Sequence, residues 1–147
     1  MSEIGISEEV DFEIEKEVWN IYELADGTVL KARCVLFKLL RTPIPQQPGK
    51  YQYQGAFQNI VMVKSKQKGT PSNQVYPPDE LAKMPKSEVN YTTVLEEWNI
   101  YRVPDGLRAK VKMLVSSIYR LRNLFDRFGD PMYILQTSQV IAPVEKP

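Results

Sequence analysis

The most informative part of this sequence is a nine-residue segment that occurs twice, as WNIYELADG at residues 19–27 and as WNIYRVPDG at residues 98–106. The first four residues of the two copies are identical, and Asp-Gly follows at the same distance in both, at a constant offset of 79 residues. Similarity at a fixed spacing indicates a repeated structural unit, so the sequence predicts an internal duplication. Deleting two residues after Gly106 gives a second alignment, which keeps every side chain on the same face of a strand.

Each copy has the pattern of a β-hairpin. Asp-Gly between two runs of alternating apolar and polar residues favours a two-residue type I′ turn, which needs positive φ at both central positions. With this turn, Tyr22 pairs with Lys31 and Trp19 pairs with Cys34, and the second copy gives the same kinds of pair. Trp and Ile then form an apolar face, whereas Tyr, Asn, Lys and Arg form a polar face that is open to water.

A third strand is expected after each hairpin, at residues 57–63 and 132–141. The first hairpin is joined to its third strand by residues 42–49, whose three prolines exclude a central strand. In the second copy, residues 121–128 fit either a short amphipathic helix or a hairpin that turns at residues 128–131.

The predicted organisation is one compact domain that contains both copies. Its parts are a flexible acidic N-terminus at residues 1–10, β repeat 1 at 11–64, a Pro/Ser-rich linker at 65–90 and β repeat 2 at 91–143. Within the linker, one helical turn over residues 80–83 with Asp79 as its N-cap is expected.

Neither apolar face can stay in contact with water, so the copies must cover one another. We therefore expect an all-β fold with minor α content, in which internally duplicated antiparallel hairpin-plus-strand units form a pseudo-symmetric small barrel or sandwich. Packing of the copies between chains in a symmetric homo-oligomer meets the same requirement.

Charge is segregated along the chain, although its net value is only +1. Residues 1–27 contain nine acidic residues and one basic residue, and residues 28–78 contain eight basic residues and no acidic one. A weaker acidic-to-basic alternation follows in residues 79–125. Pairing between strands of opposite charge explains this pattern, and an acidic tail beside a nucleic-acid patch is the alternative.

Composition and motifs argue against most chemistry. The chain has no histidine and one cysteine, so we expect no intramolecular disulfide, no metal site and no cofactor, with Cys34 as a buried structural thiol. It has no nucleotide-binding glycine loop and no nucleophile elbow. Without a recognisable secretory signal or a run of 18 apolar residues, the sequence predicts a cytoplasmic protein that does not span a membrane.

These features together predict a non-enzymatic β-rich interaction or assembly module, which associates with itself or with a protein partner in a larger complex. The expected binding residues are those of the polar face: Asn20, Tyr22, Lys31, Arg33, Asn99, Tyr101, Lys110 and Lys112. Aromatic rings beside cations on a sheet also suit single-stranded nucleic acid, which is the first alternative. The second alternative is a carboxylate-dependent enzyme in the groove between the copies, because carboxylate pairs leave no sequence motif.

Overall fold

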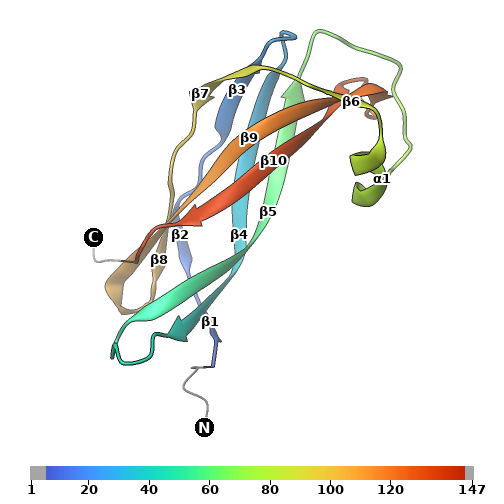
Figure 1. Cartoon of the computed structure of the whole chain (residues 1–147). Coiled ribbons are helices and arrows are strands. Elements are labelled where there is room, and N and C mark those ends of the chain that lie inside the picture. Colours follow the sequence, from blue (N-terminus) through green and yellow to red (C-terminus); the bar gives the residue numbers. More distant parts are fainter. Residues whose placement is uncertain (1–5, 145–147) are drawn as a thin grey trace.

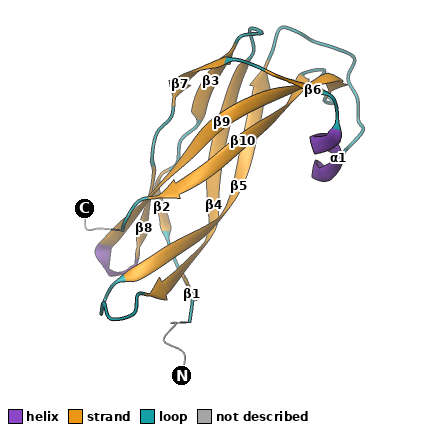
Figure 2. Ribbon diagram, in the orientation of Figure 1, coloured by secondary structure: helices purple, strands orange, loops and turns teal. Residues whose placement is uncertain are grey.

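Two five-stranded antiparallel sheets form the body of the protein in a computed structural model that describes residues 6–144 (Figure 1). The first half of the chain contains β1 (Glu8–Val10), β2 (Glu13–Lys16), β3 (Asn20–Leu24), β4 (Val29–Pro43) and β5 (Tyr51–Lys64). The second half contains α1 (Pro78–Lys83), β6 (Lys86–Glu88), β7 (Tyr91–Leu95), β8 (Asn99–Val103), a 3-10 turn (Pro104–Gly106), β9 (Leu107–Phe125) and β10 (Pro131–Ile141). Strands dominate and helix is minor, as expected, and neither sheet is closed (Figure 2).

The two sheets have the same plan. In the first, the long strand β4 pairs with β5 along one side and with β3 and β1 in succession along the other. In the second, the long strand β9 pairs with β10 along one side and with β8 and β6 along the other. The hairpins β3–β4 and β8–β9 have identical registers at the offset of 79, since Asn20 is opposite Ala32 and Asn99 is opposite Val111. This register agrees with the alignment that has no deletion.

Each half of the chain gives one strand to the sheet of the other half. The chain passes from β1 to β2, but β2 pairs with β8 of the second sheet. In the same way β7, which lies between β6 and β8 in the chain, pairs with β3 of the first sheet (Figure 1). The links at residues 17–19 and 96–98 therefore cross between the sheets on the same side of the sandwich.

The hairpin loops contain three residues, not the two that the sequence analysis predicted. Glu23 is opposite Val29, and the Leu24 amide donates to the Thr28 carbonyl at 2.9 Å, so the loop is residues 25–27. Gly27 has φ of +87°, as the left-handed position of a three-residue loop requires. The second loop, residues 104–106, has the same length. One extra loop residue shifts the register by one and exchanges the two faces of each hairpin.

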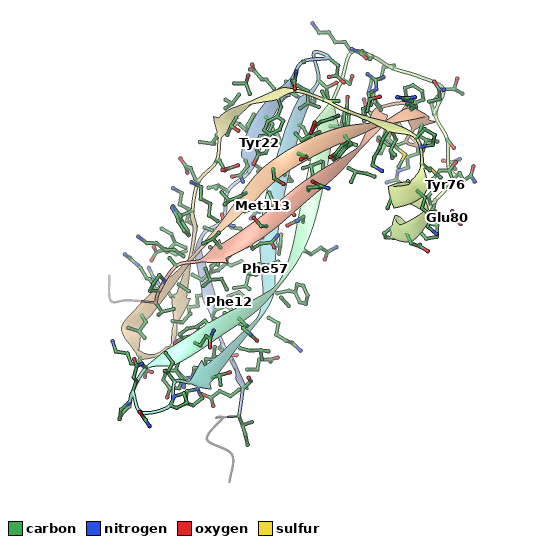
Figure 3. All side chains as sticks on the ribbon, viewed as in Figure 1. Phe12, Tyr22, Phe57, Tyr76, Glu80 and Met113 are labelled. Atoms are coloured by element: carbon green, nitrogen blue, oxygen red, sulfur yellow. The ribbon has the colours of Figure 1, made fainter. Side chains whose placement is uncertain are left out.

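The core lies between the sheets and is formed within one chain. One cluster of buried residues combines Leu36 and Leu39 of the first sheet with Tyr101 and Val111 of the second. The other combines residues of β3 and β4 with residues of β9, and Phe57 packs against both clusters. Figure 3 shows Tyr22, Met113, Phe57 and Phe12 following one another along the length of the sandwich. The expected covering of one copy by the other is thus met without a second chain.

Several local predictions can now be compared with the structure. The third strands are found as β5 and β10, and the proline-containing residues 44–50 form the connection before β5. The amphipathic helix at residues 121–128 is wrong, because β9 continues to Phe125 and then turns into β10 as a hairpin.

The predicted boundaries of the flexible and linker segments also differ from the structure. A helical turn does occur in the linker, but its N-cap is Pro77, not Asp79, and it makes no side-chain cap. Residues 8–10, expected in the flexible N-terminus, form β1, and residues 1–5 of that segment lie outside the described residues. The linker also contains β6, the counterpart of β1 in the second sheet.

Candidate interaction surface

The eight residues predicted to form one open polar face are divided between the inside and the outside of the sandwich. Asn20, Tyr22, Asn99 and Tyr101 are buried, with exposed fractions of 3%, 0%, 4% and 0%. Lys31, Arg33, Lys110 and Lys112 lie on the opposite, outward side of the same hairpins. The predicted shared face is therefore wrong, and its physical reason is the one-residue change of register caused by the three-residue loops.

The two tryptophans are on the outer side, not in the core. The Arg33 guanidinium carbon lies 5.8 Å from the ring centre of Trp19, and the Lys112 ammonium lies 5.8 Å from that of Trp98. Both indoles are partly exposed. Each outer surface thus carries an aromatic ring beside a cation, but the ring is Trp and not the predicted Tyr.

The buried asparagines hold the two sheets together where the chain crosses between them. The Asn99 side-chain amide donates to the Cys34 carbonyl at 3.1 Å, and its oxygen accepts from the Val18 amide at 3.0 Å. Asn20 makes the matching bonds to the Met113 carbonyl and from the Glu97 amide, both at 3.3 Å. These groups satisfy backbone atoms at the crossings, so their role in the structure is internal.

The buried tyrosines are tied to carboxylates of the crossing segments. The Tyr22 hydroxyl donates to Glu96 at 2.7 Å, and the Tyr101 hydroxyl donates to Glu17 at 2.8 Å. Burial, with the neighbouring carboxylate, raises the pKa of both tyrosines above its usual range. Glu17 also accepts from Arg33, 2.9 Å away. These pairs fix the crossings and leave the hydroxyls protonated.

Each end of the sandwich carries a cluster of one Arg, one Tyr and the Asp of a hairpin loop from the other half. At one end, Asp26 accepts from the Tyr133 hydroxyl at 2.6 Å and from Arg120 at 3.2 Å. Burial tends to raise the pKa of Asp26, but the hydrogen bonds from Tyr133 and Thr28, helped by Arg120, hold it below its ordinary value. Burial and the bond to Asp26 raise the pKa of Tyr133 to about 12.

The matching cluster at the opposite end is looser. Arg41 and Asp105 stand 79 residues from Arg120 and Asp26, and the Arg41 Nη1 atom lies 3.6 Å from the Asp105 carboxylate. The Asp105 side chain is 70% exposed, against 15% for Asp26. Arg41 bonds instead to Glu8 of β1 at 2.5 Å and lies over the ring of Tyr51. The aspartates that the sequence analysis assigned to turns therefore also anchor the ends of the long strands.

Charge pairing between strands agrees with the first interpretation of the segregated sequence. The acidic strand β1 pairs with the basic end of β4, through Glu8 with Arg41 and Glu9 with Lys38. In the second sheet, Glu15 contacts Arg102 of β8 and Arg108 of β9 at 3.0 and 2.9 Å. The N-terminal acidic block is thus used within the chain.

The surface with the clearest potential for binding is the side of the sandwich opposite the crossings. There β5 and β10 are the edge strands of their sheets, and we call these two strands the open edge. They meet where Asn59 bonds to Thr137 at 3.1 Å and to Gln139 at 3.4 Å. Lys64 is the only charged residue among the 14 residues of β5 and the 11 of β10, although 25% of the whole chain is charged. This charge-free pattern was visible in the sequence and was missed.

The open edge also exposes apolar side chains. Ile60, Val61 and Met62 of β5 are 44%, 41% and 46% exposed, and Val140 of β10 is 41% exposed. Successive residues of a strand point to opposite faces, so exposure of three in a row means that β5 is accessible from both faces as well as along its edge.

A cavity of about 440 Å³ lies beyond the end of the open edge, between the connector after β5 and the β9–β10 turn. Val75, Tyr76, Phe128 and Met132 supply most of its apolar lining, and Arg127 is its cation. Within residues 6–144, no group of three or more His, Cys, Asp or Glu side chains is arranged to hold a metal ion. The helices of the same range include none long and apolar enough to cross a membrane.

Comparisons with protein-family models, with curated proteins and with solved structures found no match for this chain.

Proposed function

We propose that this protein is a non-enzymatic assembly module whose open edge receives a β-strand of another protein chain. The observation that carries the proposal is the pair of long edge strands, β5 and β10, which together contain one charged residue. An edge strand presents unpaired backbone N–H and C=O groups, and addition of a strand to such an edge is a recurring mode of protein recognition.

The other edges of this molecule show how a protein protects an edge that must not pair. β1, β2 and β6 are only three or four residues long, and each carries at least two charged residues. Short length and charge are the usual means of preventing edge-to-edge association. The fourth edge strand in the described part of the chain, β7, is uncharged but has only five residues. Protection is thus present on three edges and missing from the two longest.

Light scattering at increasing protein concentration tests this proposal. We expect the mass of the wild-type chain to rise above 17.0 kDa with concentration, because strand addition buries the apolar residues of the open edge. Val61→Lys on β5 or Val140→Lys on β10 should reduce the association, since an ammonium group opposes pairing at the edge on which it lies. Thr92→Lys on β7 is the matched control and should leave the association unchanged. A strict monomer that also purifies without any bound protein would reject the proposal.

Single-stranded nucleic acid is a second candidate, because each outer surface places a tryptophan beside Arg33 or Lys112. Bases stack on exposed aromatic rings while cations contact phosphates. Arg33 is already paired with Glu17, which weakens this candidate. In a filter-binding titration, nucleic-acid binding predicts an affinity that falls as salt rises and is lost in Trp19→Ala. Failure of the oligonucleotide to bind at low salt would remove this candidate.

A further inference from the structure

We propose that the partner of β5 is β5 of a second copy of this chain, with the two strands antiparallel across a twofold axis. The inference rests on the proposed function and adds the identity and geometry of the partner. It follows from the charge, the exposure and the regularity of β5 compared with those of β10.

The charge pattern of β5 suits pairing with itself. In a twofold antiparallel pair, every residue of the strand is opposite a residue of the same strand, and like charges that face each other destabilise a sheet. Residues 51–63 contain no charged side chain, so no register creates such a conflict. Lys64, at the end of the strand, would face an uncharged residue of the partner strand.

The backbone of β5 is also regular enough to accept a strand. The bulge in its pairing with β4 places the extra residue, Phe37, on β4 and not on the edge. β5 has no proline, and residues 58–62 are all exposed. A strand added here would cover Ile60 and Met62 on one face and Val61 on the other, which removes apolar surface from water on both sides.

β10 is a poorer site for a second copy. The connector residues 72–76 line the same cavity as Met132, so they crowd the first part of β10. Most of the remaining strand is partly covered, and Val140 is its one strongly exposed apolar residue. β5 has no such neighbour along residues 58–62, and we therefore assign the twofold contact to β5.

Disulfide trapping of the full chain tests the geometry. Cys34 is buried, and burial, with the nearby Glu17, raises its pKa to about 11, so the native thiol gives little background. Single cysteines placed by Gln58→Cys, Ile60→Cys and Met62→Cys should form a covalent dimer under mild oxidation. The yield should be highest at the residue nearest the axis and several-fold lower two residues away, because a disulfide needs Cβ atoms within roughly 3.5–4.5 Å.

A charge exchange at Ile60 provides the second test. Ile60→Lys and Ile60→Glu should each weaken the dimer on the order of tenfold, since each variant places a like charge near its copy in the partner. An equimolar mixture of the two should recover most of the association, because opposite charges then face each other. Thr92→Cys on β7 and Val140→Cys on β10 are matched controls for the trapping and should give no dimer.

The outcomes separate the partner from the function. Efficient trapping through Val140→Cys but not through β5 would overturn the twofold contact and still support assembly through the open edge. Masses that grow beyond a dimer, with trapping through both strands, would show head-to-tail association and would also overturn it. A monomer at every concentration would reject the β5 dimer, and if it also purifies without a bound protein, the proposed function fails with it.

Discussion

Asn99→Ala is expected to lower the free energy of unfolding by about 2–4 kcal/mol. The Asn99 side chain is buried between the sheets, where it bonds to the Cys34 carbonyl and to the Val18 amide at 3.1 and 3.0 Å. The substitution leaves both backbone groups without these partners in a buried environment, where each unsatisfied group costs about 1–3 kcal/mol. Urea unfolding can be followed by fluorescence of Trp98, the preceding residue.

The repeat provides a matched comparison for this variant. Asn20→Ala removes the corresponding bonds, which are 3.3 Å long, so its effect should be smaller. Ile100→Ala, next to Asn99 on the partly exposed outer side, controls for loss of side-chain volume. If Asn99→Ala were no more harmful than Ile100→Ala, the buried amide would not be a main connection between the sheets.

Asp26→Asn should lower the free energy of unfolding by about 1–3 kcal/mol at neutral pH, the second largest effect we expect. The carboxylate accepts from the Tyr133 hydroxyl, the Thr28 amide and Arg120, and its side chain is 15% exposed. Asparagine keeps the size and the turn preference of Asp26 but loses the charge that strengthens these bonds. Asp105→Asn is the control and should change stability by no more than about 0.5 kcal/mol, because Asp105 is exposed and lies 3.6 Å from Arg41.

The same pair of variants should differ in their response to acid. The pKa of Asp26 is lower in the folded protein than in the unfolded chain, so its contribution is present above the ordinary value near 4 and is lost as pH falls through the folded pKa. Wild type and Asp105→Asn should therefore lose more stability than Asp26→Asn between about pH 6 and about pH 2. Parallel losses in all three proteins would contradict this assignment.

The sequence was sufficient to predict the β fold, the two hairpins and their third strands, because alternation and Asp-Gly turns are local signals. It was not sufficient to orient the hairpins. Asp-Gly fits a two-residue loop and also the end of a three-residue loop, and only the neighbours Ala25 and Pro104 separate the two cases. Since a strand repeats every two residues, this ambiguity turned Tyr22 inward and Trp19 outward, against the prediction.

The polar interior was hidden for a related reason. Asn20 and Tyr22 look like surface residues until partners are known, and those partners are Glu96, Glu97 and Met113, more than 70 residues away. The exchange of β2 and β7 brings these residues together, and no local pattern indicates it. The open edge, by contrast, depends on composition alone, and the charge-free stretch at residues 51–63 can be read from the sequence.

The exchange of β2 and β7 also has a consequence for synthesis of the chain. β2 pairs Glu13 with Arg102, and β7 pairs Leu24 with Tyr91, so both sheets depend on contacts between residues far apart in the sequence. Proteins of such high contact order fold slowly. A nascent chain that has left the ribosome only as far as the connector has β3 without its outer neighbour and β2 without any sheet to join. Folding of either half must therefore wait for translation of the other.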